Sequence, residues 1–325
     1  MLTIPTAGIA AEQELGLVAI ATQVEKGKGM TNAAWVFPGQ GSQAIGMGAD
    51  LATEALAQAR FAEAENILGW SVLDVVQAAD DKVSNTLYTQ PCLYVIESIL
   101  ADLLKEQGHQ PAVVAGHSLG EYVALYTAGV FDFAAGLTLV QRRAELMSQA
   151  SDGMMAALLG FDADELAAKI EATPGVVLAN DNNPGQVVIS GTPEAVTAVM
   201  EGVKAKRAVK LNVSGAFHSP LMADAAATFQ AVLEPIPFAT AQVPVLSNVD
   251  PTPSTDGSVL KQRLVQQMTD SVRWREITLA LPELGIDTVV EVGPGNVLTG
   301  LTKRTCKELA LVNVGNLEQV AGLAS

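Results

Sequence analysis

The sequence predicts an α/β protein in which a mostly parallel sheet carries helices on both faces and a smaller unit is inserted into the chain. Short apolar runs such as 33–37 and 288–291 alternate with stretches of helical periodicity, which is typical of a parallel sheet. Between residues 154 and 211 the order changes to βαββαβ, a ferredoxin-like split unit. Strand–helix alternation then resumes, so we interpret this ferredoxin-like unit as an inserted subdomain.

Length and composition restrict the class of protein. The chain has 325 residues, of which 49% are hydrophobic and 17% charged, enough for one large domain and a smaller one. No apolar run is long enough to span a membrane. Cys92 and Cys306 lie far apart in the sequence, so we expect neither a disulfide framework nor a zinc or other metal site, and we expect a cytoplasmic protein. The net charge of −16 argues against nucleic acid as a partner.

Domain boundaries follow from these changes of pattern. We expect residues 1–29 to be an N-terminal extension that need not be ordered, with Met30 as the usual start; a docking helix is the alternative. This stretch lacks the basic start and apolar core of a signal peptide. Residues 30–152 are expected to form the first part of the large domain, 153–214 the ferredoxin-like subdomain and 215–325 the second part of the large domain.

In the first part of the chain, glycine and proline mark where elements begin and end. The strand at 33–37 leads into the loop Pro38–Gln43. Pro91 is expected in the first turn of a helix that Gly108 ends. A further helix is expected over 133–150.

The inserted unit and the last part of the chain carry their own signals. Asp162 and Glu165 form a capping box that opens one helix, and Thr192 before Pro193 starts another. The strands expected from apolar runs are 154–159, 176–178, 187–190, 208–211, 243–246 and 288–291.

The strongest chemical signal is the pentapeptide Gly116-His-Ser-Leu-Gly120. It follows the apolar run 112–115 and precedes helix-forming residues, so it predicts a sharp strand-to-helix turn with Ser118 at its apex. The two glycines allow the backbone on either side of the serine to approach closely. The alternative is an ordinary strand-to-helix turn without chemistry.

A serine nucleophile needs a base, because a free hydroxyl is barely ionised at neutral pH. The chain has three histidines. His117 is adjacent to Ser118 and should point elsewhere, and His109 is expected on the surface. His218, before the helix start Ser219-Pro220, is the remaining candidate for a general base, with a capping or core role as the alternative.

Arg143 falls beside the apolar face of the helix predicted over 133–150. A guanidinium on a core-facing arc is costly unless it is paired. Its partner is either a structural carboxylate or the carboxylate of a ligand, which a guanidinium binds through two parallel hydrogen bonds.

The remaining parts of a serine-dependent site are less clear from the residues. The backbone N–H of Leu119 is one expected donor of an oxyanion hole, and the loop around Gln40 is a candidate for the second. No acid that would orient His218 stands out. Asp250, Asn248 and a backbone carbonyl all remain open.

Taken together, these residues resemble the family of malonyl-CoA:acyl carrier protein transacylases and the acyltransferase domains of polyketide synthases. The matching segments run in the family's order from about residue 33 to 302. They are Val36–Gln43, Thr89–Pro91, Gly116–Tyr122, Arg143, Gly215–His218, Gln267, Glu291–Gly295 and Val297–Gly300.

The resemblance implies an α/β-hydrolase-like core and a ping-pong transfer of a malonyl group, supplying fatty acid synthesis. In that reading Ser118 becomes malonylated and His218 shuttles the proton. The backbone N–H groups of Gln40 and Leu119 form the oxyanion hole. The main-chain carbonyl of Gln267 orients His218. Malonyl-CoA is a substrate, so no cofactor is implied.

The resemblance also implies how the substrate is held. Arg143 would bind the free carboxylate of malonate, Gln90 and His117 would line the substrate site, and Phe217 would disfavour a branched methylmalonyl unit. A transient acyl carrier protein is the implied partner of a protein that we expect to be a monomer.

Because coenzyme A and carrier protein are both anionic, local cations are needed at the entrance. We favour Lys204, Lys206 and Arg207, above all the last two, with Lys303, Arg304 and Lys307 as a second basic cluster; solvated surface residues are the alternative for both clusters. Three other functions remain open: the same chemistry in polyketide synthesis, an esterase, and an inactive binding module. Arg143 argues against the esterase, since a neutral substrate has no use for a buried cation.

Overall fold

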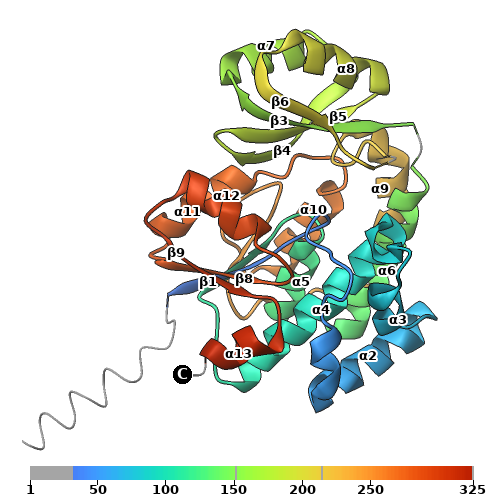
Figure 1. Ribbon diagram of the computed structural model, residues 1–325, viewed down its shortest axis with the longest axis vertical. Helices are drawn as coiled ribbons and strands as arrows, with labels where there is room; N and C mark the ends of the chain where they lie inside the picture. Colours follow the sequence, from blue (N-terminus) through green and yellow to red (C-terminus); the bar gives the residue numbers. More distant parts are fainter. Residues whose placement is uncertain (1–31, 151, 214, 324–325) are drawn as a thin grey trace, which may run out of the picture.

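The larger part of the protein is built on a five-stranded sheet (Figure 1). The computed structural model describes residues 32–150, 152–213 and 215–323. The strands lie in the order β7-β2-β1-β8-β9, and each neighbouring pair is parallel. This confirms the predicted α/β class with a mostly parallel sheet. The strands are β1 (Ala33–Phe37), β2 (Val113–Gly116), β7 (Val245–Leu246), β8 (Thr288–Val292) and β9 (Ala310–Val314).

Both faces of this sheet are buried, which explains why its strands read as continuous apolar runs. On β1, Trp35 and Phe37 belong to one hydrophobic cluster, whereas Ala34 and Val36 belong to a second cluster on the opposite face. Neighbouring residues of a strand point to opposite faces, so each strand contributes to two cores.

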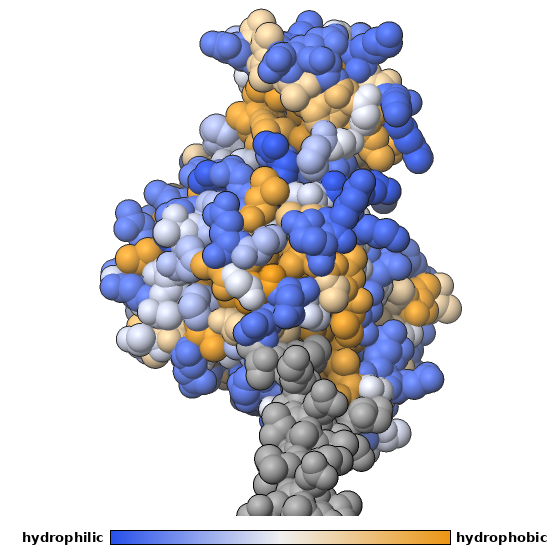
Figure 2. Space-filling model, turned by 90° about the vertical axis from the view of Figure 1, so that its left-hand side faces the viewer, coloured by the Kyte–Doolittle hydropathy of each residue, from blue (hydrophilic) through white to orange (hydrophobic). Residues whose placement is uncertain are grey.

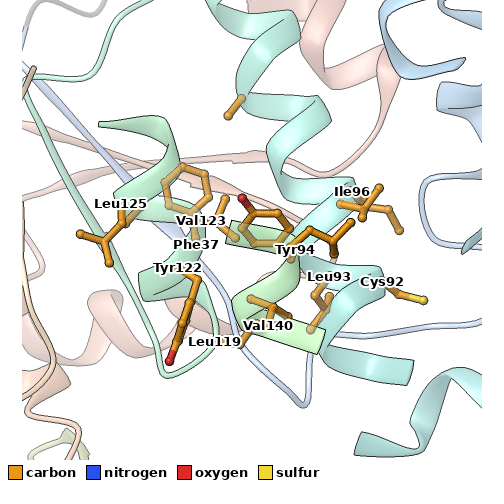
Figure 3. Packing of buried hydrophobic residues seen from close by; sticks show 14 of the residues in the cluster. Phe37, Cys92, Leu93, Tyr94, Ile96, Leu119, Tyr122, Val123, Leu125 and Val140 are labelled. Atoms are coloured by element: carbon orange, nitrogen blue, oxygen red, sulfur yellow. The ribbon is translucent and has the colours of Figure 1, made fainter. Parts of the chain in front are cut away.

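The larger core contains side chains from most of the helices. Tyr94 of α4 and Tyr122 and Val123 of α5 gather with Phe37 in this cluster (Figure 3). The elements that contribute to it are the 3-10 turns η1 (Ala49–Thr53), η2 (Lys82–Ser84) and η3 (Pro220–Met222), together with α2 (Ala55–Leu68), α3 (Val72–Gln77), α4 (Thr86–Glu106), α5 (Gly120–Thr127), α6 (Phe133–Ser148), α9 (Ala223–Leu233), α10 (Gly257–Gln266) and α13 (Leu317–Leu323).

The opposite face of the sheet is covered by α11 (Trp274–Glu283) and α12 (Val297–Thr305). Trp274 and Ile277 of α11 and Leu298 of α12 pack against the second cluster. In Figure 1 both helices lie on the side of the sheet away from α4 and α6.

A smaller unit lies at one end of the molecule, with α7 and α8 on its outer side (Figure 1). Its four strands are antiparallel and lie in the order β4-β5-β3-β6. In Figure 2 the outer helices are largely hydrophilic, and apolar surface appears at the narrower region below them. The elements follow one another as β3 (Met154–Phe161), α7 (Ala163–Glu171), β4 (Val176–Asn183), β5 (Gln186–Gly191), α8 (Pro193–Gly202) and β6 (Ala205–Lys210).

Hydrogen bonds and an ion pair join strand β4 of the small unit to the large unit. The backbone N–H of Asp181 donates to the carbonyl of Val272, and the N–H of Val272 donates to the carbonyl of Ala179. Arg275 of α11 forms an ion pair with the Asp181 carboxylate at 2.8 Å. These bonds place the inner face of the small sheet next to the carboxyl ends of the large sheet.

Most predicted elements are present, and the capping signals act as expected. The side chains of Asp162 and Thr192 accept hydrogen bonds from the N–H groups of Glu165 and Ala195. The placement of Pro91 was wrong: helix α4 begins at Thr86, and the proline lies inside it. The earlier start follows from Asn85, whose side chain caps the helix by accepting from the N–H of Leu87.

Two further points concern the chain as a whole. In the part of the chain that the structure describes, no helix is long and apolar enough to cross a membrane. The predicted N-terminal extension, residues 1–29, lies outside the described residues.

Candidate active site

The turn after β2 has the shape that its glycines predict. Ser118 adopts φ = 53°, in the left-handed region that a residue with a side chain rarely occupies. A Cβ atom on Gly116 would lie 1.9 Å from the backbone of Gly120, and one on Gly120 would lie 2.0 Å from the carbonyl oxygen of Phe37. Neither position accepts a side chain, so the serine is held at the apex between β2 and α5.

His218 lies within hydrogen-bonding distance of the serine, although the two residues are 100 positions apart. Ser118 Oγ is 2.8 Å from His218 Nε2, and His218 Nδ1 is 2.8 Å from the carbonyl oxygen of Gln267. A carbonyl can only accept, so Nδ1 carries the proton and Nε2 is left to accept from the serine hydroxyl. This is the tautomer that a general base requires.

The surroundings of His218 favour the neutral imidazole. Burial, together with the positive charge of Arg143, lowers its pKa from the ordinary 6.5 to about 3. Like Ser118, His218 has a positive φ, 56°. Backbone strain of this kind concentrates at functional sites.

Arg143 of α6 is 1% exposed and lies beside Ser118. One guanidinium nitrogen is 2.9 Å from Ser118 Oγ and 3.2 Å from Oε1 of Gln267; the other terminal nitrogen is 2.6 Å from Oε1 of Gln90. No carboxylate forms an ion pair with it among the described residues. The guanidinium is therefore oriented by two neutral amides, which leaves its charge available to a ligand.

Two backbone N–H groups near Ser118 donate no hydrogen bond among the residues described: those of Leu119 and Gln40. The loop that carries Gln40 lies against the elbow, since a Cβ on Gly39 would lie 2.4 Å from the carbonyl oxygen of His117. The N–H of Ser118 itself is bound, at 2.7 Å, to Oδ1 of Asn248. The two free donors are the ones that the sequence suggested for an oxyanion hole.

These groups face a cavity of about 240 Å³ between the two units. Its lining includes Ser118, His218, Arg143, His117 and Phe217. His117 Nε2 is 2.9 Å from Oδ1 of Asn182 on β4, so this ring points toward the small sheet. The other lining residues are Gly39, Gln40, Leu119, Met147, Met155, Ala157, Asn180, Asn182, Gln186, Val188, Leu211, Val213, Val297, Leu298 and Leu301.

Several predicted residues lie outside the cavity lining. Gln90 contacts Arg143, and Gln267 contacts His218, so both lie behind residues that line the cavity. Asp250, which the sequence left open as the partner of His218, instead forms an ion pair with Arg263. His109, expected on the surface, is half-buried.

The two favoured cations of β6 are exposed, on opposite faces of the small sheet. Arg207 pairs with Leu159 of β3 and so shares the face of Ala157, which lines the cavity. Lys206 directly precedes Arg207 in the strand and therefore points to the opposite face of the sheet, which the helices cover.

Sequence reasoning left the role of Asn248 open and missed Glu121 and Asn182. Asn248 follows β7 at the carboxyl end of the sheet, where ligands gather in such folds, and this position was the available signal. Glu121 and Asn182 gave none, because their partners are 127 and 65 residues away along the chain. No cluster of His, Cys, Asp and Glu side chains suited to a metal ion occurs in the described part of the chain.

Comparison with known proteins shows the family to which the chain belongs. Residues 34–324 match the family model described as an acyl transferase domain, so the chain belongs to the acyltransferase family.

Individual relatives then narrow the family. The chain is 58% identical to the malonyl CoA-acyl carrier protein transacylase of Synechocystis, over 89% of this chain and 99% of the relative. The crystal structure of the Synechocystis enzyme matches with a TM-score of 0.89 and 57% identity, covering 90% of this chain and all of the other. A malonyl-transacylase solved with a type II polyketide synthase carrier protein matches at 0.87 and 38%, covering 90% of this chain and 99% of that one. Within the acyltransferases, the chain belongs to the malonyl-CoA:acyl carrier protein transacylases.

Proposed function

We propose that the protein transfers a malonyl group from malonyl-CoA to the phosphopantetheine thiol of acyl carrier protein, through a malonyl ester of Ser118. The observation that carries this proposal is that Ser118 Oγ lies within 2.9 Å of both His218 Nε2 and the guanidinium of Arg143. A malonyl thioester has an electrophilic carbonyl and a carboxylate one carbon apart. A nucleophile and a cation in contact match that spacing.

In the first half-reaction, the Ser118 hydroxyl gives its proton to His218 Nε2 as the oxygen attacks the thioester carbonyl. The negative charge that develops on the carbonyl oxygen is stabilised by the N–H groups of Leu119 and Gln40. The tetrahedral intermediate then collapses, the carbon–sulfur bond breaks, and coenzyme A leaves with the proton from His218. The main-chain carbonyl of Gln267 keeps the imidazole in the required tautomer.

In the second half-reaction, the carrier-protein thiol gives its proton to His218 and attacks the serine ester. Collapse of this intermediate returns the proton to Ser118 and releases malonyl carrier protein. The chemistry is complete without a metal or redox cofactor, because the acyl group is already activated as a thioester.

Arg143 is proposed to bind the malonate carboxylate with its planar fork. The side-chain oxygens of Gln90 and Gln267 each accept from one terminal nitrogen of the guanidinium, which fixes its orientation before substrate arrives. This arrangement supports acyl transfer over the esterase reading. His117 is proposed to line the acyl and pantetheine path.

The proposal extends to the architecture of the two units and to the cellular role of the protein. We infer an α/β-hydrolase-like core, residues 30–152 and 215–325, with a ferredoxin-like subdomain at 153–214; the elbow and the order of the antiparallel strands support this. We expect a cytoplasmic monomer that supplies fatty acid synthesis. The polyketide reading remains an alternative, because a relative solved with a polyketide carrier protein is 38% identical.

The function is tested by intact-protein mass spectrometry after brief mixing with malonyl-CoA. We expect the mass to rise by one malonyl group in the native protein, to stay unchanged in Ser118→Ala, and to return when acyl carrier protein is added. Loss of the group to water as fast as it forms would favour a hydrolase. Absence of both adduct and released coenzyme A would contradict the proposal.

Phe217 is proposed to exclude a methyl branch on the α-carbon. Its buried ring lines the cavity immediately before His218. In Phe217→Ser we expect the preference for malonyl-CoA over methylmalonyl-CoA to fall roughly tenfold, as is usual for a contact with one methyl group. Paired kcat/KM values measure this preference. A variant that loses malonyl transfer without gaining methylmalonyl loading would contradict the assignment.

Arg207 and Lys206 are proposed to attract the acidic carrier protein. Reversing both charges should raise the KM for carrier protein, and more strongly at low salt, because exposed charges are screened by salt. Of the single variants, Arg207→Glu should have the larger effect, since Arg207 lies on the face that borders the cavity, and Lys206→Glu, on the opposite face, the smaller one. A KM that is insensitive to both substitutions at low salt would rule out this surface.

A further inference from the structure

We propose that Asn248 is a positioning residue that holds the nucleophile elbow in its reactive conformation. This inference rests on the proposed role of Ser118 as nucleophile. Asn248 is fully buried and is not among the residues that line the cavity, so it acts on the reaction only through the elbow.

The elbow needs such support because its backbone is strained. A non-glycine residue at φ = 53° is in a strained backbone conformation, which persists only where its surroundings impose it. The apolar contacts of Leu119 and Tyr122 anchor the helix side of the turn. They do not by themselves fix the peptide groups on either side of Ser118.

One carboxamide, that of Asn248, binds the two successive peptide groups that precede Ser118. Oδ1 of Asn248 accepts from the N–H of Ser118 at 2.7 Å, and Nδ2 donates to the carbonyl oxygen of Gly116 at 2.6 Å. Since an N–H only donates and a carbonyl only accepts, these partners also decide which end of the carboxamide is oxygen. The side chain therefore clamps the residue before the turn to the residue at its apex.

Asn248 is itself fixed from two other elements. Its N–H donates to Oε2 of Glu121, in the first turn of α5, and its carbonyl accepts from the N–H of Arg273. The same Glu121 oxygen accepts from Nε2 of Gln267, which also donates to the carbonyl oxygen of Ser118. The elbow is thus held on both sides of Ser118 by amide groups that one buried carboxylate aligns.

This clamp has a direct consequence for the oxyanion hole. Because Asn248 binds the N–H of Ser118, the free donor at the turn is the next one, that of Leu119. Without the carboxamide, the N–H of Ser118 and the carbonyl of Gly116 lose their partners and the turn is free to relax. Oγ and the N–H of Leu119 would then move together, whereas Arg143 and the acyl pocket would stay in place.

The test compares Asn248→Ala and Asn248→Leu with the native protein. Leucine has the branching of asparagine but a larger volume, so both variants lose the hydrogen bonds, whereas only Asn248→Ala leaves a cavity. We expect kcat for malonyl transfer to fall roughly 10- to 100-fold in both, with the KM for malonyl-CoA changing less than about threefold, because a displaced nucleophile slows the chemical step. Thr278→Ala is the matched control: it alters another buried polar side chain that does not touch the elbow.

A second readout does not depend on malonyl-CoA. The rate at which phenylmethanesulfonyl fluoride, an uncharged reagent, modifies Ser118 should fall in parallel with kcat in both variants. Folded variants with native Ser118 reactivity, or with an effect on KM alone, would overturn the proposal. If the native protein forms no malonyl adduct, the proposed function fails, but this rate still tests the clamp.

The native protein provides a test that needs no variant. The amide hydrogen of Ser118 should exchange slowly with solvent, because it is bound to Asn248, whereas that of Leu119 should exchange fast, because it faces the cavity. NMR-detected hydrogen exchange measures both. Fast exchange at Ser118 would overturn the proposal even if neither variant folds.

Discussion

Replacing His218 with alanine is expected to slow formation of the acyl-enzyme by roughly 10⁴-fold or more, the usual cost of losing the base of a serine nucleophile. His218 Nε2 is the only unprotonated ring nitrogen within hydrogen-bonding distance of Ser118 Oγ in the described part of the chain. Release of coenzyme A in a single turnover measures the rate. His109→Ala is the control, since this histidine does not line the cavity.

A smaller loss, below about 100-fold, would mean that another group accepts the proton. The pH dependence gives an independent check. The base must be neutral, and a pKa of about 3 means that it is neutral throughout the ordinary range. The reactivity of Ser118 toward phenylmethanesulfonyl fluoride should therefore stay level as the pH falls from 8 through 6.5, where an unperturbed histidine would already have lost half its effect.

Arg143→Ala is expected to remove the preference for a malonyl group. A bidentate bond between a guanidinium and a carboxylate in a buried site is worth about 3–4 kcal/mol, so kcat/KM for malonyl-CoA should fall roughly 10²- to 10³-fold. The reaction with acetyl-CoA, which has no second carboxylate, should fall little or rise. Kinetics with both thioesters give the selectivity directly.

Two further observations would distinguish a binding role from a structural one. Arg143→Lys keeps the charge but loses the fork, so it should recover only part of the selectivity. Arg143 also lowers the pKa of His218, since two positive charges in contact repel. Its removal should raise that pKa and move the acid limb of Ser118 reactivity to higher pH. Equal losses with malonyl-CoA and acetyl-CoA would show that Arg143 serves folding instead.

Local sequence signals predicted the fold class because they act over short distances. The continuous apolar run of β1, the caps at Asp162 and Thr192 and the glycines of the elbow each express a local requirement of backbone or burial. The start of α4 was misplaced because the proline at 91 was taken as the first-turn signal, whereas the side chain of Asn85, six residues earlier, caps the helix.

The candidate site was predicted in part. Ser118 stood out by its glycines, His218 by elimination among three histidines, and Arg143 by its place beside an apolar face. The structure brings all three within hydrogen-bonding distance. Asp250, one of three partners of His218 that the sequence left open, instead pairs with Arg263, and the main-chain carbonyl of Gln267 lies beside the imidazole.

The sequence by itself determined the nucleophile turn, the alternation that builds the parallel sheet, and the family to which the chain belongs. Each depends on residues that are neighbours along the chain or on motifs in a fixed order. Only the tertiary structure decided that Arg143 is held by Gln90 and Gln267 and that the carboxamide of Asn248 binds the backbone at Gly116 and Ser118. It also places the carbonyl of Gln267, which the family resemblance implied as the partner of His218, 2.8 Å from Nδ1. These contacts join segments 49 to 132 residues apart, and a hydrogen bond between distant segments leaves no periodicity or spacing in the sequence that would reveal it.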